Sequence, residues 1–334
     1  MSYCFQINLA LYLLCNKQYG NLLFVHFVLG EMSKEEEILS ACTVKWGEDE
    51  RTEYFEEHFN EWINQFPEEA QGVVYQLVEL FEYYSHEQIN QYLCDLNEKL
   101  EGSEQFDSSH AIYTLLPSTK GIANSSSDYL FEFRCINHKT KYETVLDLSK
   151  YAERENYKHI ENIVIIDDYC GSGHSLATFI ENHSSILKGK RIFYLVTYLM
   201  EESLSLITTT AEKHHVDVKV IFINSGKKVF DNSCMANPEE VRTVIKTCSE
   251  IFKINEFYWL GSYESQSLVA FYNDTPNNTI GLFWYDTKKY FSIFPRDFEN
   301  KKGCKRPTPK SMSLQKQSRR SQNYAAKARK VENE

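Results

Sequence analysis

Two adjacent acids followed by a glycine-containing loop form the part of this sequence with the clearest chemical potential. Asp167 and Asp168 directly follow the apolar run Asn162–Ile166, which is typical of a buried strand. The residues that then lead into an apolar helix are Tyr169, Cys170, Gly171, Ser172, Gly173, His174 and Ser175. Glycines let a backbone turn tightly and bring its N–H groups toward one point, and a following helix adds amino-terminal donors. The loop is therefore predicted to bind a phosphate.

The two acids indicate that a sugar accompanies this phosphate. A carboxylate repels a bound phosphate, so Asp167 and Asp168 must contact another part of the ligand. The vicinal hydroxyls of a ribose are suitable hydrogen-bond donors for them. Negative charge here also favours the positive charge that develops on a sugar ring in an oxocarbenium-like transition state. We therefore predict a sugar-phosphate site in which these two acids are the catalytic residues.

The segment 165–175 resembles the phosphoribosyl pyrophosphate motif of type I phosphoribosyltransferases. That motif consists of an apolar strand, two acids, three variable residues, Thr or Ser, Gly, any residue, and Thr or Ser. Its fixed positions are filled by Asp167, Asp168, Ser172, Gly173 and Ser175. The resemblance implies that the acids hold the ribose hydroxyls and that residues 169–175 wrap the 5′-phosphate. It also implies Mg²⁺, held through diphosphate and ribose oxygens rather than by metal ligands from the protein.

A second loop is our candidate for binding the diphosphate. Phosphoribosyltransferases bind this group with a short loop after an earlier strand, and residues 117–121 follow the expected strand Ala111–Leu116. Lys120 supplies positive charge in this loop, with Gly121 beside it. Residues 124–127 could equally be a plain loop and helix cap. A degenerate diphosphate loop would bind a nucleotide without transferring anything, so an enzyme and a non-catalytic nucleotide-sensing module both stay open.

A C-terminal segment carries a second resemblance. Residues 273–284, with Phe294, Pro295 and Arg296 downstream, resemble the C-terminal block of a bacterial phosphoribosyltransferase-like family. That family is found in conflict and anti-phage systems, including some that accompany retron reverse transcriptases, and its members tend to carry an N-terminal helical region. The resemblance implies a toxic effector of a retron-type defence system, restrained by a nucleic-acid-containing partner such as a reverse transcriptase complex. The turn Pro276–Asn278 could meet a base or close a capped hairpin.

Two other glycine-rich loops have similar compositions. The loop of S-adenosylmethionine methyltransferases also follows an acid at a strand end, and Glu201 could imitate the ribose-binding acid of that family. However, Tyr169 lies where that loop needs its first glycine. A Walker A loop is excluded because it needs Gly at position 168 and Lys at position 174. A methyltransferase is therefore the lesser alternative to transfer or hydrolysis of a phosphoribosyl group.

The hydrophobic periodicity changes near residue 106. Apolar residues at three- and four-residue spacing predict a helical domain over residues 32–105. Over residues 106–300 strands alternate with helices, which predicts an α/β domain with a mostly parallel sheet. The resemblance implies the Rossmann-like type I phosphoribosyltransferase fold, which binds ligands at the carboxyl ends of its strands. The expected strands are Ala111–Leu116, Asn162–Ile166, Arg191–Tyr198, Val216–Ile223, Ser267–Tyr272 and Thr279–Trp284.

Composition indicates a folded protein with an uneven charge. The 334 residues are 42% hydrophobic and 14% aromatic, and the net charge is −11. Residues 301–334 contain eleven Lys or Arg and two acids, so a basic, disordered tail follows an acidic body. The tail could contact the nucleic-acid-containing partner or serve only as a solvated terminus. The nine cysteines include no CxxC pair, which indicates reduced thiols in a cytoplasmic protein without a zinc site.

The first 31 residues receive a separate prediction. Their two apolar runs are shorter than the ~20 residues that a membrane span requires, and no basic segment precedes them as in a secretory signal. No membrane association is therefore expected. Ser33, directly after Met32, is placed to cap a helix with acids in its first turn. We expect translation to begin at Met32, with residues 1–31 an extension that is not translated.

Overall fold

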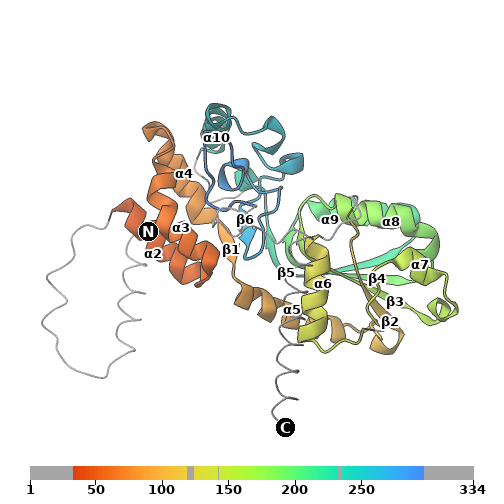
Figure 1. The fold of residues 1–334 in the computed structure, drawn as a ribbon. Coiled ribbons are helices and arrows are strands. Elements are labelled where there is room, and N and C mark those ends of the chain that lie inside the picture. The colour runs from red at the N-terminus through yellow and green to blue at the C-terminus, as the bar shows by residue number, and fades with distance from the viewer. Residues whose placement is uncertain (1–32, 119–123, 142, 232–234, 236, 297–334) are drawn as a thin grey trace, which may run out of the picture.

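The computed structural model describes residues 33–118, 124–141, 143–231, 235 and 237–296. Within them the main sheet is parallel, with the strand order β2-β3-β4-β5 (Figure 1). The strands are β2 (Ala111–Leu115), β3 (Asn162–Cys170), β4 (Arg191–Met200) and β5 (Asp217–Gly226). Register aligns Leu115 with Ile166, and Ile166 with Leu195. The carboxyl ends of the strands therefore lie at the same end of the sheet. β3, which carries the two acids, is a central strand between β2 and β4.

Helices cover both faces of this sheet, as Figure 1 shows. They are α5 (His86–Glu101), α6 (Ser125–Ile136), α7 (Leu148–Ala152), α8 (His174–Leu187) and α9 (Ser203–His214). Helices α5 and α6 pack on one face with Val164 and Ile166 of β3, whereas α8 and α9 pack on the other with Ile163 and Ile165. Because neighbouring strand residues point to opposite faces, one continuous apolar run serves both cores. The predicted α/β fold with a parallel sheet and N-terminal helices is confirmed.

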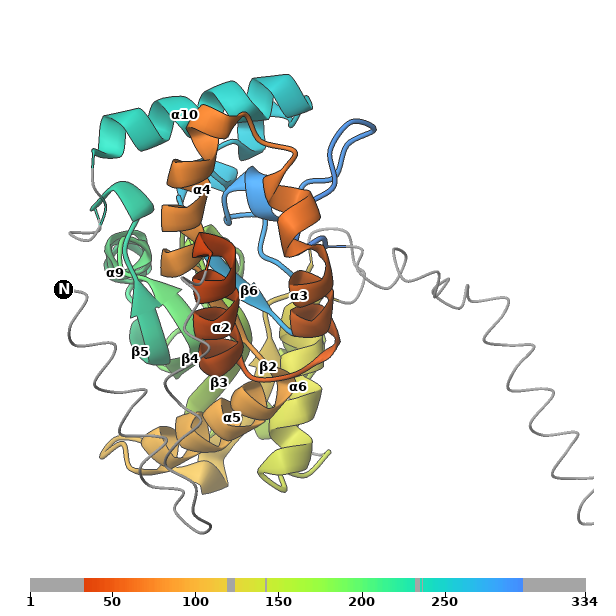
Figure 2. The ribbon, with the colours of Figure 1, turned by 90° about the vertical axis from the view of Figure 1, so that its left-hand side faces the viewer.

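The amino-terminal helices pack with the carboxyl-terminal part of the chain (Figure 2). The elements concerned are α2 (Lys34–Trp46), α3 (Glu50–Ile63), α4 (Glu68–Leu80), β1 (Glu82–Tyr84), α10 (Pro238–Phe252) and β6 (Val269–Phe271). β1 and β6 form a small parallel sheet in which Tyr83 lies opposite Ala270. The Phe294 ring lies against two others, with its centroid 5.6 Å from that of Trp46 and 4.9 Å from that of Phe81. One aromatic core therefore joins two ends of the described chain.

Short 3-10 helices complete the described elements. They are η1 (Ser108–His110), η2 (Glu155–His159), η3 (Val229–Asp231), η4 (Glu256–Tyr258), η5 (Ser262–Glu264) and η6 (Gly281–Phe283). The strand expected over residues 279–284 is wrong, because η6 occupies this segment and its sheet contact in the described part is a single bridge from Thr279 to Ser267. Every residue from 279 to 284 is buried. A short apolar run that is buried on all sides does not alternate between apolar and polar residues. Its sequence therefore does not distinguish a strand from other structure in the core.

The packing of the helices can be compared with the predicted domain boundaries. The Ser33 side chain accepts a hydrogen bond from the Glu36 amide, which confirms the predicted start of α2. Helices α2–α4 share a core with residues 229–294, and α5 shares one with the sheet. The division at residue 105 stays a prediction. So do the predictions for residues 1–31 and 301–334, which lie outside the described residues.

Two further features of the described residues concern membrane-spanning helices and cysteines. No helix in this part of the chain has the length and apolar character needed to cross a bilayer. The cysteines in it, Cys42, Cys94, Cys135, Cys170 and Cys248, are all free thiols.

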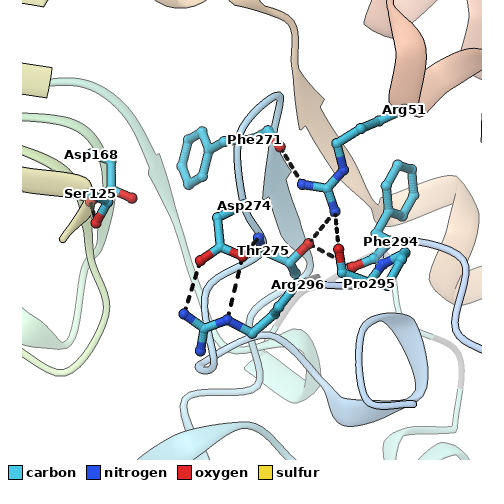
Figure 3. Close-up of polar contacts among 9 residues, drawn as sticks. All are labelled: Arg51, Ser125, Asp168, Phe271, Asp274, Thr275, Phe294, Pro295 and Arg296. Carbon is cyan, nitrogen blue, oxygen red and sulfur yellow. Dashed lines mark hydrogen bonds and ion pairs between the residues drawn. The ribbon is translucent and has the colours of Figure 1, made fainter. Parts of the chain in front are cut away.

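The buried Arg51, in the first turn of α3, connects segments that are far apart in the sequence. Its Nη1 donates to the Phe271 carbonyl at 2.6 Å. Its Nη2 donates to Thr275 Oγ1 at 2.7 Å and to the Pro295 carbonyl at 3.1 Å (Figure 3). Burial lowers the pKa of the guanidinium, against the opposing charge of nearby acids. One side chain thus fixes the end of β6 and the last described turn to the amino-terminal helices.

We predict that Arg51→Met lowers the free energy of unfolding by about 3 kcal/mol, because buried acceptors lose their donor. Urea denaturation followed by tryptophan fluorescence measures this change. The matched control is Arg154→Met, since Arg154 is exposed and lies 5.2 Å over the Tyr151 ring. Its expected change is below about 0.5 kcal/mol. Equal stability of the two variants would contradict the role assigned to Arg51.

Candidate functional site

Asp167 and Asp168 lie in the last part of β3, at the edge where the strands of the sheet end. Both are buried, each with 7% relative exposure. Successive residues of a strand point to opposite faces, so Asp167 meets Tyr194 on one side of the sheet and Asp168 meets Ser125 on the other. The structure thus places the two predicted acids at the carboxyl end of the parallel sheet, with different surroundings.

Asp167 is held by the neighbouring strand β4. The Tyr194 hydroxyl donates to Asp167 Oδ2 at 2.8 Å, and the Asp168 amide donates to Oδ1 at 3.2 Å. Burial raises the pKa of Asp167 well above its ordinary value, and the adjacent Asp168 carboxylate adds to this effect. Burial and the neighbouring acid therefore both disfavour the charged form of this carboxyl group relative to a carboxyl group in water.

Asp168 is held by the first turn of α6. Ser125 Oγ donates to Asp168 Oδ1 at 2.8 Å (Figure 3), and Thr197 Oγ1 donates to its carbonyl at 2.5 Å. Burial raises the pKa of Asp168, the Ser125 hydrogen bond opposes this, and the negative charge of Asp274 adds to the rise. Two buried acids with raised pKa values become ionised more easily when a ligand supplies hydroxyl donors or a cation.

Two glycines are required by the loop that follows. Gly173 has a φ of +79°, and a Cβ there would lie 2.9 Å from the Ser203 carbonyl oxygen. A Cβ on Gly171 would lie 2.6 Å from the side chain of Asn278. Gly173 therefore permits the left-handed turn into α8, and Gly171 permits the close approach of the carboxyl-terminal segment.

Helix α8 begins at His174 without a side-chain cap, since Gly173 occupies the N-cap position. The first amides of a helix have no intrahelical acceptor, and the helix dipole favours an anion at this end. Ser172 Oγ and His174 Nδ1 lie 2.9 Å apart, and the Ser175 side chain is exposed. The start of α8 thus offers main-chain N–H groups without a side-chain cap, with the Ser172 and Ser175 hydroxyls in the same segment, which suits an anion.

The side chains of Tyr169 and Cys170 pack against the protein interior. The Tyr169 ring stacks on Tyr198 with centroids 6.0 Å apart, and Cys170 Sγ lies 3.4 Å from Ser203 Oγ. Burial raises the pKa of the Cys170 thiol to about 11, so this thiol is not a nucleophile at neutral pH. A contact of Cys170 with a ligand would therefore come from its main chain, whereas the Tyr169 side chain is half-buried.

The predicted diphosphate loop is described only in part. Lys120 and Gly121 lie outside the described residues, so their role stays a prediction. Strand β2 nevertheless ends beside β3, where Leu115 is aligned with Ile166, so the loop leaves the sheet at the edge that carries the two acids. Ser125, which the sequence indicated only as part of a loop or cap, is the residue that the structure brings to the site from this region.

The carboxyl-terminal segment lies over the same edge. The Tyr263 ring stacks on His174 with centroids 4.5 Å apart. Tyr263 also has a φ of +56°, a backbone conformation rare for residues other than glycine. Asp274, paired with Arg296 (Figure 3), is close enough for its negative charge to raise the pKa of Asp168. The sequence analysis missed these contacts, because residues that are distant in sequence give no local signal of their proximity.

A comparison with known families identifies the class of this protein. The family model PRTase-CE matches residues 59–296, which is well over half of the chain. The chain therefore belongs to the PRTase-CE family, and a phosphoribosyltransferase-like family is confirmed. The matched range includes both acids, the glycine loop and the carboxyl-terminal segment. Searches of curated proteins and of solved structures each found no match.

The raised pKa values at this site predict a pH dependence of stability. When the folded-state pKa of an acid lies above its unfolded value, the native state binds more protons, so stability falls as pH rises from about 4 through the folded pKa. Asp167→Asn removes the ionisable group while its amide oxygen still accepts from Tyr194. In thermal melts without ligand, we expect this variant to be more stable than wild type near neutral pH and to lose that advantage near pH ~4. A variant less stable than wild type at neutral pH would contradict the raised pKa.

Proposed function

We propose that this protein binds phosphoribosyl pyrophosphate, or a nucleotide with the same ribose 5-phosphate part, at Asp167, Asp168 and the loop 169–175. The observation that carries the proposal is the position of two buried acids directly before an uncapped helix start, joined to it by the left-handed turn at Gly173. The family match, which covers this segment, supports the same chemistry. It also argues against a methyltransferase.

Each group of the site has one task in this proposal. Asp167 and Asp168 accept hydrogen bonds from the ribose hydroxyls. The amides of residues 172–175 and the hydroxyls of Ser172 and Ser175 bind the 5′-phosphate. Mg²⁺ would be held by diphosphate and ribose oxygens of the ligand, and its charge would favour the ionised form of the two acids.

The enzymatic form of the proposal is a glycosyl transferase or hydrolase. The bond between ribose C1 and the diphosphate oxygen breaks, and the diphosphate leaves with the bonding electrons. C1 forms a bond to an acceptor atom or to the oxygen of water, and the proton that the acceptor or water loses passes to the diphosphate or to solvent. Ionised Asp167 and Asp168 stabilise positive charge on the ring as this happens. The rigid loop and helix start hold the 5′-phosphate, so that the sugar is positioned for attack.

The proposed biological role is an effector of a bacterial, retron-type anti-phage system that acts in the cytoplasm. The resemblance of residues 273–296 to the C-terminal block of conflict-system proteins supports this role. The basic tail 301–334 supplies charge for contact with a nucleic-acid-containing partner, such as a reverse transcriptase complex. An activity on phosphoribosyl compounds would be the toxic activity that such a partner restrains.

Calorimetric titration with phosphoribosyl pyrophosphate and Mg²⁺ tests the site. We expect the double variant Asp167→Asn, Asp168→Asn to bind at least about tenfold more weakly, since hydrogen bonds to charged groups contribute about 1.5–3 kcal/mol. The matched control is Asp217→Asn, because Asp217 is an exposed acid at the opposite, amino end of β5. It should bind as wild type does. Equal binding by the double variant would exclude this site.

The same variants separate catalysis from binding alone. Release of diphosphate by the wild-type protein would establish an enzyme, whereas binding without release would indicate a nucleotide-sensing module. In cells that express the protein without its partner, we expect toxicity from wild type and from Asp217→Asn, and none from the double variant. Full toxicity of the double variant would show that the toxic activity does not use these acids.

A further inference from the structure

An ion pair from the carboxyl-terminal segment borders the two acids. Arg296 Nη2 lies 2.9 Å from Asp274 Oδ2, and its Nε lies 3.4 Å from Oδ1. Figure 3 draws Asp274 and Arg296 in one view with Asp168 and Ser125. Tyr272, two residues before Asp274, donates to Glu132 Oε1 at 2.6 Å, and Glu132 belongs to α6, the helix that carries Ser125. The charge of Asp274 contributes to the raised pKa of Asp168, so the two acids are within electrostatic reach of each other. A cation and an acid thus lie across from the proposed ribose-binding carboxylates.

Both members of this pair are positioned through the buried Arg51. Its guanidinium donates to Thr275 Oγ1 and to the Pro295 carbonyl, in the residues directly beside Asp274 and Arg296. Thr275 Oγ1 in turn donates to the carbonyl that precedes Pro295, at 2.8 Å. The main chain that carries the pair is therefore fixed from inside the protein, independently of the pair itself.

The ion pair is consequently not needed to hold these segments together. The side chains of Arg296 and Asp274 are 41% and 32% exposed, and exposed ion pairs contribute little to stability. The Arg296 guanidinium also lies 5.6 Å over the Trp284 ring, a contact that orients it. A half-exposed arginine on a fixed main chain, paired with an acid whose charge reaches Asp168, is suited to bind an anionic group of the proposed ligand.

We propose that Arg296 binds the diphosphate group of phosphoribosyl pyrophosphate and that Asp274 holds the guanidinium until the diphosphate replaces it. This inference rests on the proposed function. A planar guanidinium pairs with two phosphate oxygens as it does with a carboxylate. The N–H donors of Arg296 therefore keep acceptors when the diphosphate replaces Asp274. Asp274, once released, repels the diphosphate beside it. The two members of one ion pair therefore have opposite effects on the ligand.

Titration with two ligands tests the inference, because ribose 5-phosphate lacks the diphosphate that phosphoribosyl pyrophosphate carries. We expect Arg296→Gln to bind phosphoribosyl pyrophosphate about tenfold more weakly, the effect of one charge-assisted pair. Its affinity for ribose 5-phosphate should stay within about twofold of wild type. Asp274→Asn should bind phosphoribosyl pyrophosphate about threefold more tightly, because it removes a nearby negative charge.

A matched control comes from α10. The Arg242 guanidinium lies 4.4 Å over the Phe230 ring, and its Nε lies 3.9 Å from Glu239, so it has similar neighbours away from the site. Arg242→Gln should leave the affinity for both ligands unchanged. Arg296→Lys keeps the charge without the planar fork and should recover part of the affinity. It also provides a second folded variant if thermal melts show that Arg296→Gln is unfolded.

The outcomes separate the inference from the proposed function. Wild-type affinity of Arg296→Gln for phosphoribosyl pyrophosphate overturns the inference alone. Weaker binding by both Arg296→Gln and Asp274→Asn also overturns it, since a purely structural pair gives the same sign for both partners. A wild-type protein that binds neither ligand overturns the proposed function, and the inference with it.

Discussion

Asp167 and Asp168 lie side by side in β3 with 7% exposure each, and their surroundings supply neutral hydrogen-bond donors. These donors are the Tyr194 and Ser125 hydroxyls and a main-chain amide. A buried carboxylate loses its hydration, and two adjacent carboxylates repel each other. Neutral donors satisfy the oxygen atoms without cancelling the charge, so the pKa values remain raised. The fold thus keeps an electrostatic strain at these two acids, which the proposed ligand, with its hydroxyls and cation, would relieve.

Two parts of the structure surround Asp167 and Asp168. The helix start at His174 and the first turn of α6 belong to the sheet and its helices. The opposite wall comes from residues 263–296, which pack with the amino-terminal helices and are fixed by Arg51. Arg51 itself lies before the range matched by the family, 59–296. The amino-terminal helices therefore help to determine the geometry of the candidate site without contributing the motif residues.

Features that depend on consecutive residues could be predicted from the sequence, whereas contacts between distant residues could not. The strand at Asn162, the acids and the glycine loop are consecutive, so apolar pattern and residue type located them together. The contact between Ser125 and Asp168 spans 43 residues, and no local pattern encodes it. The segment 279–284 was expected to be a strand because its apolar run is short and continuous, but burial on all sides gives the same pattern in a core turn. The role of Lys120 lies beyond the described residues and stays a prediction.

The central claim is that the loop and helix start after β3 bind the phosphate of a phosphoribosyl ligand. Hydrogen–deuterium exchange with and without phosphoribosyl pyrophosphate and Mg²⁺ tests it most directly, because the first amides of α8 lack a side-chain cap. The account predicts slower exchange of the amides at residues 171–175, and unchanged exchange at the amino end of β5. Unchanged exchange at residues 171–175 in the presence of bound ligand would contradict it.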